Sequence, residues 1–142
     1  MSALRQPRWR GWHAAAGAAA VAAAGAGVWV LRRVDPNAPD SPLPGCLFYH
    51  FTGLYCPGCG STRALHGLVH GDLGQFLAMN PLLAVVMPAL PLLVLHGMGY
   101  RLPLPKRAID TLLSAKFWLG LMGGYWVLRN LPWWPFSWLA PG

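Results

Sequence analysis

Three long apolar segments alternate with shorter polar segments along the chain. Each apolar segment carries at most one basic side chain and no acidic one. A helix rises 1.5 Å per residue, so about twenty residues cross the roughly 30 Å hydrocarbon core of a bilayer. The pattern predicts an all-α integral membrane protein with about three transmembrane helices, at residues 12–31, 81–100 and 111–128.

The first apolar segment consists mainly of Ala and Gly. Its Ala-Gly-Ala tripeptide at 24–26 resembles a signal-peptidase site, so a cleaved signal sequence is one alternative. The apolar run nevertheless continues through Trp29 to Arg32 and Arg33, which is the arrangement of a span with interfacial anchors. We therefore expect an uncleaved helix whose small residues allow close packing against other helices.

Prolines and glycines mark special positions in the other two apolar segments. Pro88 and Pro91 each remove a helical hydrogen bond, so the helix at 81–100 is expected to kink. Gly120 and Gly124 form a G-x-x-x-G pattern, which predicts a close helix contact within the monomer or across a dimer.

The polar segments differ from one another in composition. Residues 32–55 contain four prolines and two aspartates, which predicts a non-helical linker that ends in an aromatic stretch suited to the headgroup region. Residues 1–11 and 101–110 are basic and are expected to be a tail and a loop. Residues 129–142 are rich in Trp and are expected to form an aromatic belt or a short re-entrant cap.

The polar module at residues 56–80 begins with a turn that holds two cysteines. In Cys56-Pro-Gly-Cys59, proline fixes one φ and glycine allows a positive φ, so both sulfurs can face one point. Ser61 or Thr62 is then expected to cap a helix that runs to His70.

Two further start and stop signals follow in the same module. Gly71 is expected to end the first short helix, and Asp72 with Gln75 forms the capping-box pattern of a second one. Asn80 and Pro81 repeat the signal, as a cap followed by a proline at the first position of the long helix.

Composition agrees with a membrane protein. The chain is 55% hydrophobic and 11% charged, against about 25% charged residues in an ordinary soluble domain. The formal net charge of +7 does not indicate nucleic-acid binding, because the basic residues stand at the ends of apolar segments and form no stripe with interleaved aromatics. We therefore expect the lipid bilayer as a partner and no nucleic acid.

The basic residues also predict an orientation in the membrane. Basic residues are enriched in cytoplasmic loops, and the larger group is placed inside when the N-terminus is cytoplasmic. The cysteine module is then extracytoplasmic or interfacial, although the Arg32-Arg33 pair favours the inverse. The inside group is Arg5, Arg8, Arg10, Arg101, Lys106, Arg107 and Lys116, and the outside group is Arg32, Arg33, Arg63 and Arg129.

The cysteine module resembles a known family. Residues 54–65 read Leu-Tyr-Cys-Pro-Gly-Cys-Gly-Ser-Thr-Arg-Ala-Leu, and they are followed by Gly-Asp and by Asn-Pro-Leu before an apolar span. This combination, over about residues 46–90, resembles the bacterial membrane-protein family known as domain of unknown function 2752. The resemblance implies a small polytopic protein of the bacterial inner membrane, and it brings no catalytic residues with it.

The cysteines permit three kinds of chemistry. Cys-Pro-Gly-Cys-Gly is the turn of zinc knuckles, so Cys56 and Cys59 are candidate zinc ligands. For thiol–disulfide exchange, the helix start and Arg63 beside Cys59 are expected to lower a thiol pKa. In an oxidising compartment, two of the three cysteines instead form a disulfide that fixes the turn. The further candidate metal ligands are Cys46, His50, His66 and His70.

Four other polar residues are candidates for binding a partner. Arg63 with Asp72, or Arg129 with a phosphate headgroup, could bind an anionic lipid or a partner peptide. The alternative is that the arginines extend to the membrane boundary and that Asp72 and Asn80 only cap helices.

Three classes of function follow from these features. The leading one is an accessory or scaffold protein with a structural or partner-binding cysteine module, which acts on another membrane protein or on a second copy. The alternative is a metal-binding or thiol-redox membrane protein that uses Cys56 and Cys59. An enzyme is disfavoured, because the sequence contains no paired intramembrane carboxylates, no Ser/His/Asp set and no phosphate-binding loop.

Overall fold

The computed structural model describes residues 10–100 and 103–141. Within those residues it contains seven α-helices, one short 3₁₀ helix and no strand, so the all-α prediction is confirmed for the described part of the chain. The helices are α1 (Arg10–Arg33), α2 (Leu47–Thr52), α3 (Ser61–Val69), α4 (Leu73–Met79), α5 (Leu82–Gly97), α6 (Lys106–Leu113), α7 (Ala115–Leu128) and η1 (Phe136–Leu139).

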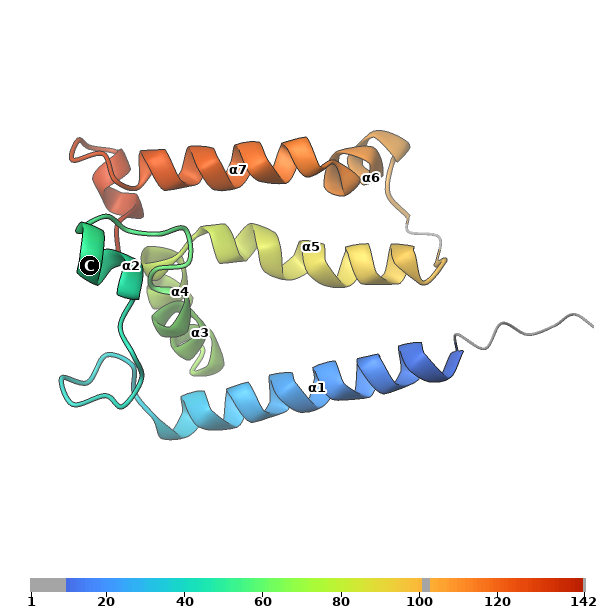
Figure 1. Ribbon diagram of the computed structural model, residues 1–142, viewed down its shortest axis with the longest axis horizontal. Helices are drawn as coiled ribbons and strands as arrows, with labels where there is room; N and C mark the ends of the chain where they lie inside the picture. Colours follow the sequence, from blue (N-terminus) through green and yellow to red (C-terminus); the bar gives the residue numbers. More distant parts are fainter. Residues whose placement is uncertain (1–9, 101–102, 142) are drawn as a thin grey trace, which may run out of the picture.

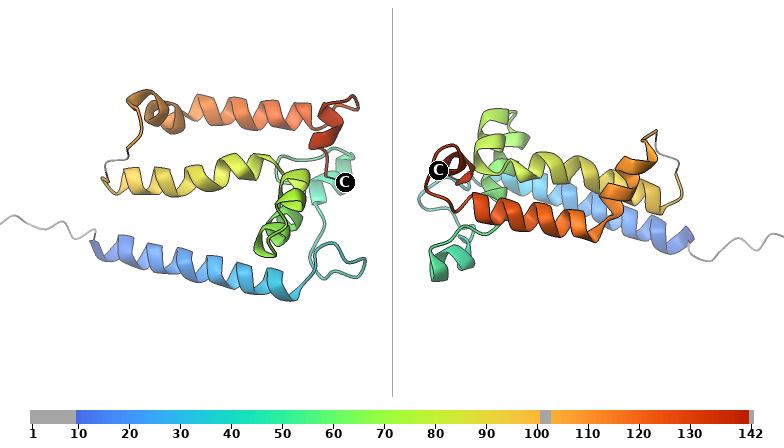
Figure 2. Two further views of the ribbon diagram at one scale, coloured as in Figure 1. Left: turned by 180° about the vertical axis from the view of Figure 1, so that it is seen from behind. Right: turned by 90° about the horizontal axis from the view of Figure 1, so that it is seen from above.

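The three longest helices run lengthwise across the molecule in the order α1, α5, α7 (Figure 1). The short helices α2, α3, α4 and η1 gather at one end of them, and α6 lies at the other end, as the views from behind and from above also show (Figure 2). The buried core lies at the end with the short helices, where Ala64, Phe76 and Tyr125 are all at most 9% exposed. The fold is therefore organised around this end.

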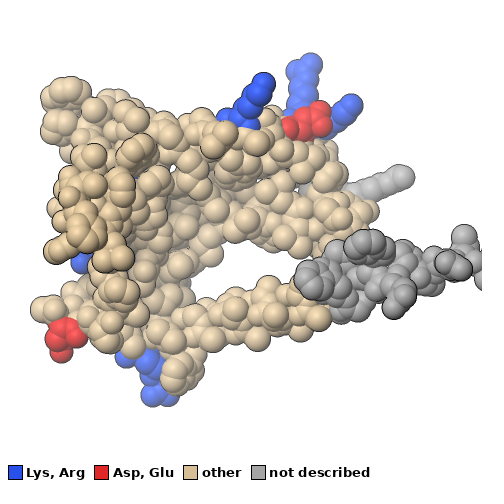
Figure 3. All heavy atoms as spheres, in the orientation of Figure 1, with Lys and Arg blue, Asp and Glu red and all other residues tan. Residues whose placement is uncertain are grey.

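Helix α1 stands apart from the other long helices. It contacts α3 near its C-terminal end, and an open gap separates the rest of it from α5 (Figure 3). Its side chains Val21 and Trp29 are 74% and 63% exposed. At 24 residues it is about 36 Å long, and it includes the whole predicted segment 12–31. The apolar side chains of α1 therefore need lipid or another protein around them.

The charged side chains gather at the two ends of the long helices (Figure 3). Lys106, Arg107 and Asp110 belong to α6 at one end, and Asp35 and Asp40 follow α1 at the other. Among the described residues, one helix is long and apolar enough to cross a membrane, over residues 15–33. Helices α4 and α5, which meet at 99°, are together long and apolar enough for a second span if they are taken as one bent helix.

Helices α3 and α4 pack against each other across a tight turn. Gly71 ends α3 with φ +80°, and the Asp72 carboxylate accepts a hydrogen bond of 2.8 Å from the backbone N–H of Gln75 at the start of α4. These are the stop and start signals expected from the sequence. Gly67 allows the close approach, because a Cβ there would lie 2.9 Å from the backbone oxygen of Asp72.

The structure differs from the sequence prediction at the starts of α2 and α3. Residues 47–52 form a helix inside the segment predicted as a linker, because the prolines of that segment end at Pro44 and neither Pro nor Gly occurs between Gly45 and Gly53. Helix α3 begins after Gly60, whose φ is +79°, with no side-chain cap. The Ser61 hydroxyl, one of the two expected caps, instead accepts a hydrogen bond from Asn80.

The third apolar segment also differs from its prediction. Residues 106–113 form α6, Ser114 leaves the helical conformation with ψ 116°, and α7 begins only at Ala115. Trp118 Nε1 donates a hydrogen bond of 2.7 Å to the backbone oxygen of Leu112, and so gives a partner to one carbonyl at the end of α6. With 14 residues, α7 is about 21 Å long. Residues 1–9 of the predicted tail and 101–102 of the predicted loop lie outside the described residues.

None of the described residues packs closely against the glycines of α7. A Cβ placed on Gly120 or on Gly124 would meet nothing within 4 Å. The expected G-x-x-x-G contact inside one chain is therefore wrong, and a contact with a second copy stays a prediction. In α5, Pro88 and Pro91 both lie inside a helix that continues through them.

Candidate metal centre

Three thiols from two segments converge at the end of the molecule with the short helices. The Sγ atom of Cys56 lies 3.4 Å from that of Cys46 and 3.1 Å from that of Cys59. All three sulfurs lie within 4.8 Å of one another, and all three cysteines are free. In the described part of the chain, no other group of three His, Cys, Asp or Glu ligand atoms is that close together.

The turn around Cys56 and Cys59 aims both sulfurs at one point. The backbone N–H of Cys59 donates to the Cys56 oxygen at 3.0 Å, and the N–H of Cys56 donates to the Cys59 sulfur at 3.1 Å. Gly60 is required next to it, because its φ is +79° and a Cβ would lie 2.5 Å from the backbone oxygen of Met79. Residues 56–60 are called the knuckle below.

Cys46 precedes α2, and its surroundings favour the thiolate. The backbone N–H of Tyr49 is the main cause, and hydrogen bonds from the other thiols contribute, so the pKa of the Cys46 thiol is lowered from 9.0 to about 7. Cys59 is only 5% exposed, and burial, with hydrogen bonds to the other thiols, raises its pKa to about 12. Cys46 therefore gives up its proton more readily than Cys59.

A buried arginine supports the knuckle from behind. Arg129, which follows α7, is 1% exposed. Its Nη1 donates to the oxygens of Cys56 and Pro57 at 2.8 and 3.2 Å, and its Nη2 donates to the oxygen of Cys59 at 3.1 Å. Its guanidinium also lies 4.9 Å from the centre of the Tyr125 ring. One side chain thus fixes three carbonyls of the same turn.

Asn80 completes this support between α4 and α5. It is also 1% exposed, and its Nδ2 donates to the oxygens of Pro57 and Cys59 at 3.1 and 3.3 Å. Its Oδ1 accepts a hydrogen bond from the Tyr125 hydroxyl at 3.1 Å. The expected helix cap at Asn80 and the expected contact of Arg129 with a headgroup are therefore both wrong, because both side chains are enclosed beneath the knuckle.

Sequence reasoning missed one residue that positions the site. The Oδ1 of Asn130 accepts from the backbone N–H of Tyr55 at 2.8 Å, and its Nδ2 donates to the Tyr55 oxygen at 2.9 Å. This two-way pairing joins the end of α7 to the residue just before the knuckle. The only sequence signal was its place beside Arg129 at the end of an apolar segment.

The three thiols line one wall of an open cavity of about 730 Å³. Residues of the proline-rich segment 36–45 line it as well, and so do Ser61, Thr62 and Arg63 at the start of α3. Among the described residues that line the cavity, Arg63 is the one charged side chain. The cavity therefore presents thiols, hydroxyls and one positive charge.

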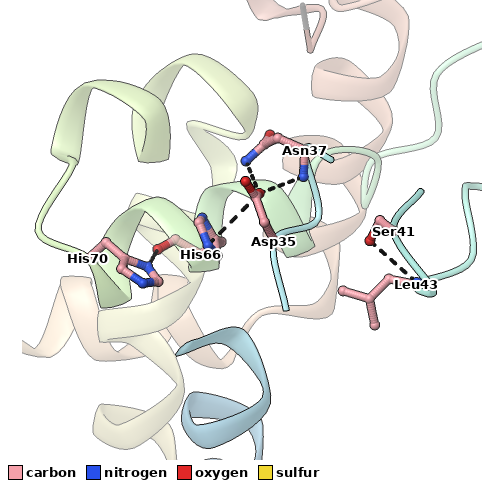
Figure 4. A network of polar contacts seen from close by, with 6 residues as sticks. All are labelled: Asp35, Asn37, Ser41, Leu43, His66 and His70. Atoms are coloured by element: carbon pink, nitrogen blue, oxygen red, sulfur yellow. Dashed lines mark hydrogen bonds and ion pairs between the residues drawn. The ribbon is translucent and has the colours of Figure 1, made fainter. Parts of the chain in front are cut away.

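The three candidate histidines lie outside the thiol group. His50 is exposed on α2 and packs against Phe51, with ring centres 5.5 Å apart. Just after α3, His70 Nδ1 lies 2.9 Å from the backbone oxygen of His66, and the centres of the two rings are 4.2 Å apart. His66 Nε2 lies 4.0 Å from Asp35 (Figure 4), so this pair meets the linker and not the sulfurs.

Asp35 and Asp72 hold backbone segments in place. Hydrogen bonds of 2.8 and 2.9 Å from the backbone and side-chain nitrogens of Asn37 reach the Asp35 carboxylate, and they hold its pKa below its usual value (Figure 4). Asp72 caps α4. Of the sequence-predicted site residues, the structure thus brings together the three cysteines, Asn80 and Arg129, with Arg63 at the same cavity.

One protein family matches part of this chain. The model of the family described as "Protein of unknown function (DUF2752)" matches residues 46–94, and it confirms the resemblance found in the sequence. No curated protein and no solved structure matches. The matched segment begins at Cys46 and contains all three thiols and Asn80, whereas Arg129 lies beyond it.

Proposed function

We propose that this chain is a small membrane protein whose three cysteines bind a divalent, thiol-preferring metal ion, with Zn²⁺ as the first candidate. The observation that carries the proposal is the convergence of three Sγ atoms within 4.8 Å, from segments on both sides of α2. Thiolate sulfur is a preferred ligand of Zn²⁺.

The spacing of the sulfurs suits such an ion. A Zn–S bond is about 2.3 Å, so two sulfurs of a tetrahedral site are about 3.8 Å apart. The Cys56–Cys59 and Cys46–Cys56 separations of 3.1 and 3.4 Å thus need to open by about 0.7 and 0.4 Å. The N–H···S hydrogen bond from Cys56 to Cys59 also favours the thiolate form that a metal requires.

The charge of the surroundings favours a divalent ion. Three thiolates and one M²⁺ ion carry a net charge of −1, and the buried Arg129 supplies +1. Its Nε atom has no hydrogen-bond partner, and no carboxylate lies within 4.0 Å of this guanidinium in the part of the chain described here. A negatively charged metal–thiolate group therefore compensates a buried positive charge that is otherwise held by carbonyl dipoles and aromatic rings alone.

Helices α1, α5 and α7 are proposed to span a bacterial inner membrane. In this arrangement the N-terminus is cytoplasmic and the thiols lie at the extracytoplasmic face. On the face shown in Figure 3, the surface between the two charged ends carries no charged side chain, which supports this arrangement. Outward-facing apolar side chains such as Leu90 and Leu119, at 56% and 74% exposure, support it as well. The protein then offers its metal site to an external partner as an accessory protein.

The metal content of the purified protein tests the proposal. Native mass spectrometry of the full-length protein in detergent should give one Zn²⁺ per chain, and Cys46→Ser, Cys56→Ser or Cys59→Ser should each remove it. His50→Ala and His70→Ala are matched controls, because both rings lie outside the thiol group, and they should keep the metal. Full metal content in all three cysteine variants would exclude this site.

A second candidate function is thiol–disulfide exchange. It is favoured by the 3.4 Å separation of Cys46 and Cys56 and by the lowered pKa of the Cys46 thiol. This function predicts protein without zinc, in which two of the three cysteines resist alkylation until a reductant is added. The same mass spectrometry, run before and after alkylation, separates the two functions.

A further inference from the structure

Helix α6 has one apolar face and one charged face. The apolar face packs against α5, where Ile109 and Leu112 help to line a gap of only about 10 Å³. Residues three or four positions apart lie on the same side of a helix, and the other side of α6 is exposed. Its side chains there are Lys106, Arg107, Asp110 and Thr111. The charged face therefore points away from the rest of the described chain.

Helix α6 is turned out of the line of α7 (Figure 2). The turn occurs at Ser114, whose ψ is 116°, and the hydrogen bond of 2.7 Å from Trp118 Nε1 to the Leu112 oxygen spans it. Helix α6 also contacts α5. If α5 and α7 cross the bilayer, as proposed above, α6 lies along the bilayer surface, in the position of an amphipathic interfacial helix.

Positive charge is in excess at this end of the molecule. Lys106, Arg107 and, in the first turn of α7, Lys116 are exposed, and Asp110 is the one acidic side chain of α5, α6 and α7. Among the described residues, none of these three basic side chains forms an ion pair within 4.0 Å. The basic side chains at this end stand clear of the surface around them (Figure 3). A negatively charged partner would therefore compensate them.

We propose that the charged face of α6 binds the anionic headgroups of phospholipids at the membrane surface. Phosphate oxygens accept charge-assisted hydrogen bonds from ammonium and guanidinium groups, and the anionic lipids of a cytoplasmic leaflet attract basic segments beside a span. Leu113, which ends α6, is 54% exposed and gives such a lipid an apolar contact near its acyl chains. This inference rests on the proposed membrane arrangement, adds a partner to it and needs no metal.

The test is local hydrogen exchange in lipid nanodiscs, whose two faces carry the same lipids, so that the orientation of the chain does not matter. Full-length protein is reconstituted in discs of phosphatidylcholine alone and in discs that also contain phosphatidylglycerol. A basic side chain near an anionic surface contributes a factor of about five in binding. Within α6, Lys106 and Arg107 outweigh Asp110, so its backbone amides should exchange about fivefold more slowly in the anionic discs. Raising the salt concentration should reduce the difference.

Variants of α6 separate its charge from its fold. Lys106→Gln with Arg107→Gln should abolish the slowing, because Gln keeps the helix propensity and Asp110 alone remains charged. Asp110→Asn should increase the slowing, because it removes the opposing charge. Arg32→Gln with Arg33→Gln is the matched control, since it removes two positive charges from the last turn of α1 at the opposite end of the molecule (Figure 1). It should leave the slowing in α6 unchanged.

The possible failures are distinguishable. Soluble glycerol phosphate, added to phosphatidylcholine discs, should not slow exchange in α6, and slowing equal to that in the anionic discs would refute a lipid surface as the partner. Equal exchange of α6 in both kinds of disc, or slowing that persists in Lys106→Gln with Arg107→Gln, would refute the role of the charged face and leave the membrane arrangement standing. Protein that enters neither kind of disc would overturn the membrane arrangement, and this inference with it.

Discussion

Replacing Arg129 by Met is expected to destabilise the protein strongly. The substitution keeps an unbranched side chain of moderate length and removes three hydrogen bonds, to the oxygens of Cys56, Pro57 and Cys59. Each carbonyl keeps a second donor, the N–H of Cys59 for Cys56 and the Asn80 amide for Pro57 and Cys59. The loss is therefore that of hydrogen bonds to a charged group, about 1.5–3 kcal/mol each. Part of this cost is offset because the variant no longer buries a charge. We therefore expect a loss of about 3 kcal/mol, which lowers Tm by about 10 °C in a chain of this length.

The assay is thermal unfolding of the metal-free, full-length protein in detergent, followed by circular dichroism. Arg129→Lys keeps the charge but has a single nitrogen to reach three carbonyls, so its Tm should lie between those of the wild type and Arg129→Met. Arg107→Met, on the exposed α6, is the control and should unfold within about 2 °C of the wild type. A Tm of Arg129→Met equal to that of the control would refute the supporting role of this guanidinium.

Three other features of the structure give direct tests. In the metal-free protein, alkylation of Cys46 should accelerate as pH rises through about 7. Cys59, whose pKa is raised to about 12, should stay unreactive in folded protein. The stability that the lowered pKa of Cys46 contributes is present above pH 9 and is lost as pH falls through about 7. Gly60→Ala should lower Tm and metal content together, because its φ is +79° and a backbone oxygen of α4 leaves no room for Cβ; metal content equal to that of the wild type would contradict this. The double substitution Gly120→Leu and Gly124→Leu should change the free energy of unfolding of the monomer by less than about 1 kcal/mol, since nothing lies within 4 Å of a Cβ at either position. If α7 forms a dimer, the same substitution should abolish it. A large loss of monomer stability would show that this face is packed within the chain.

The parts of the fold that follow local rules could be predicted from the sequence. Gly71 and Asp72 end one helix and start the next through contacts with residues at most five positions away. Local rules gave the wrong helix boundaries or caps at two positions, Ser61 and Ser114. Ser61 was expected to cap α3, but its hydroxyl accepts from Asn80 while Gly60 supplies the turn. Likewise, the backbone at Ser114 divides what looked like one helix into α6 and α7.

The support of the site could not be predicted, because it is made of contacts between distant residues. Arg129 reaches carbonyls about seventy positions earlier in the chain, and Asn80 reaches the same turn from about twenty positions away. An arginine at the end of an apolar helix is ordinarily read as a residue at the membrane boundary. Only the fold shows that both side chains converge behind the cysteines.

The dependence of the knuckle on Arg129 bears on which part of the chain forms the working unit. The segment that matches the family model, 46–94, contains every thiol. The guanidinium that holds the knuckle follows α7, and the amide of Asn130 fixes the residue before the knuckle. If the matched segment were separated from α7, three carbonyls would lose their charged partner, and a metal–thiolate group would lose the cation that balances it. The proposed metal site therefore depends on the matched segment together with the two residues that follow α7.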